Sequence, residues 1–332
     1  MKIGVVVEEP WDFFHEIYVE LCAHHDITLF KQRFVHTPFF SNRINDFLFW
    51  KDLKALLTHN DVVFFEWAGE LLVKASHFPK TCGIVVRLHR YEMYQWANRV
   101  NWGNVDKVIV VSEAKRDEFA QRFPAYKEKA VVINVSISLE RFSFRPKTFQ
   151  RNIGTLCHLT PRKRVYELIL DFYELIKKDS NFHLHIGGDP HPAFSDYLIA
   201  MQILVKELDL EDCVTFHGPV INTPDWYHNI DIFVSNSYSE GLQVALLEAM
   251  ASGCYCLSHH WSGVEELLPS DHIFYTGHEL QEKILQFVAK SELEKNALGQ
   301  QLRNLVKSRC DIDRTKIEVR ELVEIVGRQT LN

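Results

Sequence analysis

The sequence lacks the features that mark a membrane-spanning or exported chain. No run of about 18 apolar residues occurs, so we expect no transmembrane helix. The opening segment MKIGVVVEEPW places two acids, Glu8 and Glu9, where a signal peptide has its apolar core. Internal repeats and low-complexity segments are also missing. We therefore expect a cytoplasmic protein.

Paired cysteines and clustered metal ligands are missing as well. The seven cysteines are odd in number and scattered, at positions 22, 82, 157, 213, 254, 256 and 310, and none forms a CxxC pair. Most of them fall in apolar runs, where a reduced cysteine behaves as a small hydrophobic residue. We expect neither a disulfide framework nor a zinc site, and no other metal site.

The composition is that of a globular protein with an uneven charge. The chain has 332 residues, enough for two domains, and it is 46% apolar and 24% charged. Its formal net charge is −7. Residues 1–148 hold 20 basic and 18 acidic side chains, which gives +2, whereas the remainder holds 17 and 26, which gives −9. We expect no nucleic-acid partner, although a local basic groove in the first half stays open as an alternative.

Short β-rich runs alternate with helical stretches along the whole chain. The predicted strands are 3–7, 27–30, 62–65, 84–88, 108–111, 131–133, 153–157, 183–186, 214–216, 231–235, 254–258 and 273–275. The predicted helices are 13–23, 45–57, 70–77, 113–122 with Ser112 as its cap, 165–177, 194–208, a helix after residue 240, a broken helix over 279–309, and 314–326. This alternation is typical of α/β folds with doubly wound parallel sheets.

A lapse in the pattern over residues 136–150 predicts a linker between two such domains. We assign residues 1–148 to a first Rossmann-like domain and 149–312 to a second, and expect a C-terminal helix over 313–332 that packs back on the first. Ligands in such sheets bind outside the carboxyl ends of the strands. Two domains of this kind predict a cleft between them, which each motif after a strand would face.

The stretch EGLQVALLEAMASG, residues 240–253, is the most informative in the chain. The helix that it predicts is apolar on nearly all sides, so Glu248 within it needs a polar partner, because burying a lone charge costs several kcal/mol. We expect the backbone N–H groups of 241–243 at the start of this helix, where an anion such as phosphate would bind. The alternative is a core helix with a capping Glu240 and an ion-paired Glu248.

This stretch resembles the pattern E-G-F-G-x-x-x-x-E-A-M-A-x-G of the retaining glycosyltransferases of family 4, the group 1 glycosyltransferases. Leu242 and Gln243 stand here in place of Phe and Gly. CHLTPRKR, residues 157–164, is similar to the family's G-R-L-x-P-x-K-G, with Lys163 on the phosphate-binding lysine and His158 at the arginine. Three further segments match in order: IGGDP (186–190), VTFHGPV (214–220) and SGVEEL (262–267). Taken alone, PRKR would be a solvated basic turn and each glycine a structural turn.

The resemblance implies the GT-B fold, in which the first domain binds the acceptor and the second binds the donor. It also implies that the donor is a nucleotide-diphosphate sugar, bound without a metal or other cofactor. It implies that Glu240 holds the hydroxyls of the donor sugar, that Glu248 holds those of the ribose, and that Lys163 stabilises the leaving diphosphate. The remaining residues that it places around the donor are His158, Arg162, Arg164, Gly188, His217, Gly218, Val220, Gly241, Leu242, Gln243 and Val244.

The first half matches the family less closely. His89 follows a buried strand and resembles the acceptor-domain histidine that relatives place beside the transferred sugar. Where relatives show two glycines after the first strand, this chain has EEPW, so we expect that Glu8 and Glu9 meet acceptor hydroxyls. The other candidates on the acceptor side are Trp11, Glu66, Trp67 and Arg90. A charged turn, a structural histidine and a core tryptophan are the alternatives.

Residues 38–57 mix aromatic side chains with Arg43, Lys51 and Lys54. A surface that docks on a membrane has this composition, and so has an ordinary amphipathic helix. The first interpretation would place the protein at the inner face of the membrane.

The reaction that the resemblance implies is transfer of a hexose from a UDP- or GDP-sugar to a hydroxyl of a glycan or a lipid-linked acceptor, with retained configuration. Three alternatives stay open: a nucleotide-sugar epimerase of the same fold, a non-catalytic nucleotide-sugar-binding module, and a glycosyltransferase acting on modified nucleic acid.

Overall fold

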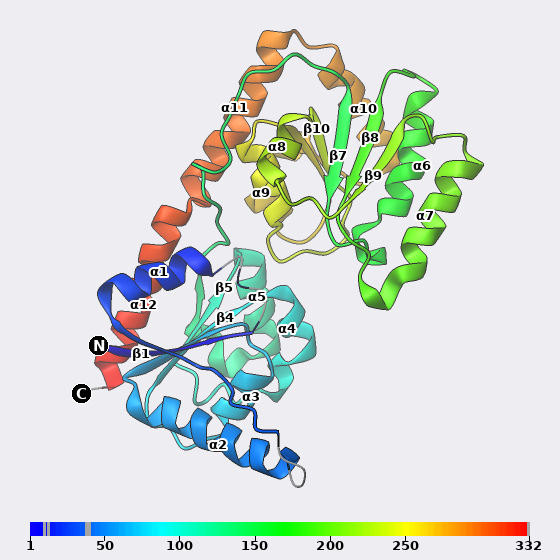
Figure 1. Ribbon diagram of the computed structural model, residues 1–332. Coiled ribbons are helices and arrows are strands. Elements are labelled where there is room, and N and C mark those ends of the chain that lie inside the picture. The colour runs from blue at the N-terminus through cyan, green and yellow to red at the C-terminus, as the bar shows by residue number, and fades with distance from the viewer. Residues whose placement is uncertain (9–10, 12–13, 37–40, 331–332) are drawn as a thin grey trace. The chain divides into compact units, whose positions relative to one another are not determined.

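The computed structural model describes residues 1–8, 11, 14–36 and 41–330. The chain divides into two compact units, which are coloured by residue number in Figure 1. Unit 1 consists of Met1–Val135 and Ile312–Asn332, and unit 2 consists of Ser136–Asp311. Each unit is built on one six-stranded sheet whose strands are all parallel. The predicted fold class of two doubly wound parallel sheets is therefore confirmed.

The sheet of unit 1 has the strand order β2-β1-β3-β4-β5-β6. The strands are β1 (Lys2–Val7), β2 (Asp26–Leu29), β3 (Val62–Glu66), β4 (Gly83–Leu88), β5 (Lys107–Val110) and β6 (Ala130–Val132). The helices are α1 (His15–His24), α2 (Ser41–His59), α3 (Glu70–Ser76), α4 (Arg90–Gln95), α5 (Glu113–Arg122) and α12 (Ile312–Thr330). The Ser112 hydroxyl accepts the backbone N–H of Lys115 at 3.2 Å, which is the predicted cap of α5.

Both faces of this sheet are covered, as the continuous apolar character of β3 and β4 requires. On one face, Phe14 of the α1 region and Val319 and Val323 of α12 pack into one core with Ile3 and Val5 of β1. On the other face, α2, α3 and α5 supply the core. The last helix of the chain thus belongs to the first unit, because its apolar stripe is buried there (Figure 1).

The sheet of unit 2 has the strand order β12-β11-β10-β7-β8-β9. The strands are β7 (Asn152–Leu156), β8 (His183–Gly187), β9 (Val214–Gly218), β10 (Ile232–Ser235), β11 (Tyr255–His259) and β12 (Ile273–Phe274). The helices are α6 (Val165–Ile176), α7 (Ser195–Glu207), α8 (Thr223–His228), α9 (Val244–Ala251), α10 (Gly277–Val288) and α11 (Glu292–Arg309). The short helices α4 and α8 were not predicted, because six residues are too few to show a helical period.

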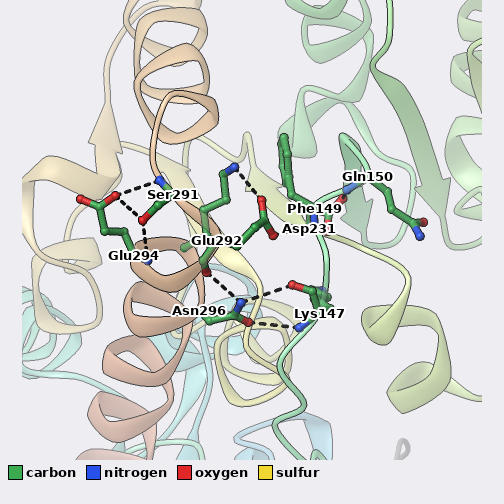
Figure 2. Close-up of polar contacts among 9 residues, drawn as sticks. Lys147, Phe149, Gln150, Asp231, Ser291, Glu292, Glu294 and Asn296 are labelled. Carbon is green, nitrogen blue, oxygen red and sulfur yellow. Dashed lines mark hydrogen bonds and ion pairs between the residues drawn. The ribbon is translucent and has the colours of Figure 1, made fainter.

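Side chains of unit 2 hold the segment that enters it (Figure 2). Asn296 of α11 accepts the backbone N–H of Lys147 at 3.1 Å and donates to its carbonyl at 3.3 Å. Glu292 accepts the N–H of Phe149 at 3.0 Å, and Asp231 accepts that of Gln150 at 2.9 Å. Although residues 136–150 look like a linker in the sequence, they therefore group with unit 2.

The strand order reverses between β1 and β3 in unit 1 and between β7 and β10 in unit 2. Loops that leave the carboxyl ends of the strands at such a reversal diverge to opposite faces of the sheet, which leaves a crevice for a ligand. The residues singled out in the sequence follow these strands: Glu8 after β1, Glu66 and Trp67 at the end of β3, residues 157–164 after β7, and residues 236–243 after β10.

Candidate functional site

Two loops of unit 2 meet at the reversal point of its sheet. One loop, residues 157–164, follows β7 and ends in a short 3-10 turn, Pro161–Lys163. The other, residues 236–243, follows β10. The N–H of Tyr238 donates to the carbonyl of Arg162 at 3.3 Å, and the Asn236 amide donates to the carbonyl of Arg164 at 2.9 Å. The two motifs therefore form one structure.

Lys163, Arg162 and Glu240 form a charged cluster where these loops meet. Lys163 Nζ lies 2.5 Å from Glu240 Oε1, and Arg162 Nη1 lies 3.0 Å from the same oxygen. Arg162 also donates to the carbonyl of Ser239 at 2.5 Å. Burial alone would raise the pKa of Glu240, but the charges of Lys163 and Arg162 outweigh it, so the pKa lies below its ordinary value. Two cations are thus held side by side by one ionised carboxylate.

The helix α9 begins at Val244, three residues later than the sequence suggests. Gly241 and Leu242 lie in the loop, and Gln243 is the N-cap, its side-chain oxygen accepting from the buried Ser235 hydroxyl. The expectation that the N–H groups of Gly241, Leu242 and Gln243 start the helix was wrong, since residue 243 is still extended. The first-turn N–H groups, which lack intrahelical acceptors, are those of Val244 and the two residues after it.

Glu248 lies on α9 with a different partner and a different protonation. The Tyr227 hydroxyl donates to Glu248 Oε2 at 3.0 Å and to the carbonyl of Ala245, also at 3.0 Å. Burial raises the pKa of Glu248 to about 7, although this hydrogen bond and the charge of Arg141 act against it. Burial also raises the pKa of Tyr227, so the phenol stays protonated. The polar partner that Glu248 needs is thus a tyrosine, and an ion pair was not required.

Two glycines predicted around the donor lie at adjacent strand ends. Gly188, after β8, has φ +116°, and a Cβ there would lie 1.8 Å from the carbonyl oxygen of Cys157. Its N–H donates to the carbonyl of Gly218 at 2.8 Å. Gly218, at the end of β9, has φ +61° and no atom within 4 Å of its Cβ position. Val220 packs against Gly187.

The remaining donor-side candidates are more exposed. His158 is exposed on the loop after β7, and His217 is exposed on the edge strand β9, 3.0 Å from His185. Arg164 has φ +51° and lies beside Glu167, 3.8 Å away. Of the cations near the loop, the structure brings Lys163 and Arg162 to Glu240, whereas Arg164 points to its own helix.

In unit 1, the candidates gather around His89 at the ends of β3 and β4. His89 Nε2 lies 2.9 Å from Glu66 Oε1, and Glu66 is 0% exposed. The other oxygen of Glu66 faces the buried guanidinium of Arg87 at 3.5 Å. The indole of Trp67 lies over the His89 ring, with 4.2 Å between ring centroids. Trp67 has φ +81°, a conformation that bulky residues rarely adopt.

Two more carboxylates border this cluster. Glu8 accepts the backbone N–H of Leu71 at 3.1 Å, and Glu92 accepts that of His89 at 2.9 Å. Burial raises the pKa of both carboxyls, and each carboxyl accepts a hydrogen bond from the backbone. Glu92 had no assigned role, yet it is the carboxylate that fixes the backbone of His89.

The last acceptor-side candidates do not join the cluster. Trp11 packs on Phe14 and Tyr18, and Arg90 lies over the ring of Tyr94, 5.0 Å from its centroid. Glu66, by contrast, belongs to the cluster, but it is fully buried against Arg87 and His89 and presents no surface to an acceptor. Glu9 lies outside the described residues.

Several site residues gave no signal in the sequence. Tyr227, Arg87 and Ser235 lie in apolar or strand-like runs and reach the site only through the fold. Among the described residues, no three His, Cys, Asp or Glu side chains are grouped to bind a metal ion. Within the same residues, we find no helix whose length and apolar character would carry it across a bilayer.

Comparison with known proteins agrees with this arrangement. The family model "Glycosyl transferases group 1" matches residues 150–290, all within unit 2. The alpha-monoglucosyldiacylglycerol synthase of Streptococcus pneumoniae is 27% identical over 240 residues, which cover 65% of this chain and 52% of that protein. The mannosylfructose-phosphate synthase of Agrobacterium fabrum is 32% identical over 120 residues, 34% of this chain and 25% of that protein. The chain thus matches about half or less of the length of these relatives.

The similarity to solved structures extends over the whole chain. HepE from Anabaena, solved with UDP, has a TM-score of 0.77 at 17% identity and covers 98% of this chain and 100% of its own. The sucrose-phosphate synthase of Thermosynechococcus elongatus has the same TM-score and identity and covers 99% and 100%. At this identity the similarity establishes the fold, which is GT-B.

Proposed function

We propose that this chain, which belongs to the group 1 glycosyltransferases and has the GT-B fold, transfers a hexose from a UDP-sugar to a hydroxyl of a lipid or glycan acceptor with retained configuration. The observation that carries the proposal is the cluster of Lys163, Arg162 and Glu240. It joins two family motifs at the point of the sheet where ligands of such folds bind.

The donor roles follow from the charges of this cluster. A diphosphate needs cations or N–H groups, and a sugar ring needs hydrogen-bond acceptors for its hydroxyls. Glu240 is ionised and therefore accepts hydrogen bonds from sugar hydroxyls while it orients Lys163 and Arg162. The two cations and the N–H groups at the start of α9 face the diphosphate. Gly188 and Gly218 let the backbone approach the ligand, because neither has a side chain.

Glu248 binds the ribose hydroxyls in this proposal. It lies on α9, one turn from the diphosphate end of the helix, and it is held by Tyr227. His217 and Val220 lie in and just after β9, in the segment expected to hold the nucleobase, whereas His158 lies after β7 at the arginine position of the phosphate-binding motif. Because Glu248 has a pKa of about 7, its charge and hence its affinity for hydroxyl donors change near neutral pH.

The transfer step breaks the bond between the anomeric carbon and the diphosphate oxygen and forms a bond from that carbon to the acceptor oxygen. Negative charge grows on the leaving diphosphate, and Lys163 and Arg162 stabilise it more strongly in the transition state than in the ground state. The acceptor's proton passes to the leaving phosphate oxygen on the same face of the sugar, which accounts for retention. On the acceptor side, His89 orients a sugar hydroxyl.

The choice of UDP and of the acceptor class draws on the relatives. HepE was solved with UDP and with UDP-glucose, and the pneumococcal relative is a synthase named for a glucosylated diacylglycerol. A lipid acceptor would place the enzyme at a membrane surface. The epimerase and the binding-only interpretations gain no support from any particular residue.

Transfer assays with radiolabelled sugar nucleotides test the proposal. The full chain is incubated with UDP-glucose, UDP-galactose, UDP-N-acetylglucosamine or the matching GDP-sugars. The acceptor is either diacylglycerol in detergent micelles or a glycan mixture. We expect label in a lipid or glycan product from a UDP-sugar, with an α-anomeric proton coupling by NMR. Label in a free epimerised sugar nucleotide without acceptor would favour the epimerase. Binding without any turnover would favour the binding module.

A further inference from the structure

The outward face of α2 combines aromatic and basic side chains. At about 100° per residue, Arg43, Ile44, Phe47, Trp50, Lys51 and Lys54 fall within an arc of about 120°. We call these six residues the α2 face. All are exposed, and Phe47 is 67% and Trp50 44% exposed. The buried residues of the helix, such as Phe49 and Leu53, lie on its other side and pack into the core of unit 1.

Further apolar surface adjoins the α2 face at Trp50. Beyond Trp50 lies a groove of about 590 Å³ lined by Trp50, Val73, Lys74, His77 and Phe78. Lys74 Nζ lies 4.5 Å from the centroid of the Phe49 ring. Because Trp50 belongs to both, the apolar surface extends from the α2 face into this groove.

The charges of this surface have one sign. The two acids of α2 lie outside the arc, Asp46 on one flank and Asp52 on the other, and Asp52 is neutralised by Arg33 with a hydrogen bond of 2.8 Å. A chain with a net charge of −7 thus presents a local face whose charged members are all basic. Aromatic side chains that enter the headgroup region, with cations between them, fit a bilayer that contains anionic lipid.

We propose that the α2 face docks unit 1 on an anionic membrane surface. This inference rests on the proposed function, because an enzyme that acts on a lipid acceptor has to reach it at a bilayer. Phe47 and Trp50 enter the interface, while Arg43, Lys51 and Lys54 contact lipid phosphates. None of these side chains belongs to the clusters around His89 or Glu240.

Vesicle sedimentation tests this docking directly. The full chain is mixed with vesicles of phosphatidylcholine alone or with 30% phosphatidylglycerol, about the anionic content that gives a strong surface potential. We expect the protein to sediment with the anionic vesicles. The sedimented fraction should fall at about 0.5 M salt, because salt screens the charges at the surface. Phe47→Ser/Trp50→Ser and Lys51→Glu/Lys54→Glu should each weaken binding by about tenfold or more.

Matched controls alter similar side chains elsewhere. Leu293→Ser removes an apolar residue that is 82% exposed on α11, and Lys206→Glu/Lys307→Glu reverses two exposed cations of unit 2. Both should bind vesicles as wild type does. The proposal would be overturned if the α2 variants bound anionic vesicles as strongly as wild type, or if wild type did not bind them. Concentration-dependent dimers that Phe47→Ser abolishes would also overturn it, because they would assign the face to a second copy of the chain. Transfer to a soluble acceptor in all variants separates failure of docking from failure of the proposed function.

A second inference rests on the cluster around His89. A carboxylate only accepts hydrogen bonds, so the bond between Glu66 and His89 places the proton on Nε2, and the His89 side chain in turn accepts the backbone N–H of Glu92 in a capping box. Trp67 covers the ring face from a strained backbone, and such strain persists where the surroundings enforce it, often at functional sites. We propose that Glu66 is a positioning residue that fixes the tautomer and orientation of His89. This inference also rests on the proposed function.

Two variants of Glu66 separate positioning from simple charge balance. Glu66→Gln keeps the length of the side chain and an oxygen that accepts from Nε2, whereas Glu66→Asp keeps the charge beside Arg87 but withdraws it from His89. We expect Gln to retain kcat better than Asp, by on the order of tenfold, with KM for the UDP-sugar unchanged in both. If Asp equals or exceeds Gln in kcat, Glu66 serves only to neutralise Arg87.

The tautomer supplies a test that needs no activity. In ¹⁵N-labelled protein we expect His89 as the Nε2–H form in wild type and in Glu66→Gln. His89 is assigned from the signal lost in His89→Gln. A mixed tautomer in wild type would contradict the inference even if sugar transfer is confirmed, and a fixed tautomer would uphold it even if transfer is not.

Discussion

The two units use the same fold but place different residues after their strands. In unit 2 the turn after β8 has positive φ at Gly188, where no side chain fits, and in unit 1 the turn after β3 has positive φ at Trp67, whose ring covers His89. Unit 2 brings two cations to one carboxylate, whereas unit 1 gathers Glu8, Glu66 and Glu92 around His89 and Arg87. One turn exposes backbone to a ligand, and the other positions a side chain.

This difference agrees with the position of the family model's match, which lies within unit 2. A diphosphate imposes the same needs on every relative: a lysine, free N–H groups and glycine turns. An acceptor imposes no such common set, so the residues of unit 1 are under no shared requirement of this kind. The following predictions test whether unit 2 binds a diphosphate and unit 1 positions a histidine.

The largest effect is expected for Lys163→Ala. Removing a cation that stabilises the leaving diphosphate should lower kcat by on the order of 10³-fold, since transition-state charge loses its partner. Lys206→Ala, an exposed lysine of the same unit, is the control and should leave kcat unchanged. A Lys163→Ala enzyme with wild-type kcat would break the assignment of unit 2 to the diphosphate.

A pair of glycine variants tests whether both turns of unit 2 need glycine equally. Gly188→Ala should lower the free energy of unfolding by about 3 kcal/mol or more, because the new Cβ meets a carbonyl oxygen and φ is unfavourable. Gly218→Ala should lower the free energy of unfolding by only about 1 kcal/mol, because Gly218 also has positive φ but its Cβ position meets no other atom. Urea denaturation measures both. Equal losses would mean that the close contact at Gly188 is relieved at little cost.

Glu248→Gln should change the pH dependence of both binding and stability. Only the carboxylate accepts from both ribose hydroxyls, so wild-type affinity for UDP-glucose should rise as pH increases from 5 to 8, by on the order of tenfold. UDP-glucose has no phosphate that titrates in this range. Glu248→Gln should bind with the weaker affinity and lose this dependence, as measured by calorimetry in buffers of matched ionic strength.

The stability effect of Glu248 has the opposite sign. Because the folded pKa of about 7 lies above the ordinary value of 4.5, the contribution of Glu248 to stability is complete below pH 4.5 and is lost as pH rises through 7. The Glu248→Gln protein should therefore gain stability relative to wild type between pH 5 and 8. A difference that stays constant across this range would show that Glu248 does not titrate there.

The smallest effect is expected for Trp67→Gly in unit 1. Relief of the positive φ offsets the lost ring contact, so the free energy of unfolding should change by no more than about 1 kcal/mol. Trp102→Gly, at a buried tryptophan without positive φ, is the control and should lose about 3 kcal/mol or more. Equal losses at the two positions would remove the argument that Trp67 is strained.

Much of the fold was predictable because parallel sheets have simple local patterns. All twelve strands were predicted within one or two residues, and Glu113–Arg122 with its Ser112 cap matches the predicted bounds. The start of α9 was not predicted, because the conformation of EGLQ is fixed by contacts of Gln243 with Ser235 of β10 and of Glu240 with Arg162 of another loop. The association of residues 136–150 with unit 2 also depends on distant side chains, such as Asn296.

The site was predictable only where a motif places residues in one loop. Lys163 and Glu240 were predicted because each lies in a recognisable segment. The contact between them at 2.5 Å brings the two segments together into one site. The partners Tyr227, Arg87 and Glu92 lie in segments with no pattern of their own. The burial of Glu66 follows from the ends of β3 and β4 lying side by side, which no local sequence pattern specifies.

Isothermal titration of the full chain with UDP, in buffer containing EDTA, tests the central claim most directly. We expect one site per chain with a micromolar Kd, and binding at least tenfold weaker in Lys163→Ala, because the diphosphate accounts for much of the affinity. Absence of binding at millimolar UDP, or equal affinity in wild type and Lys163→Ala, would contradict the assignment of the loops after β7 and β10 to a nucleotide diphosphate.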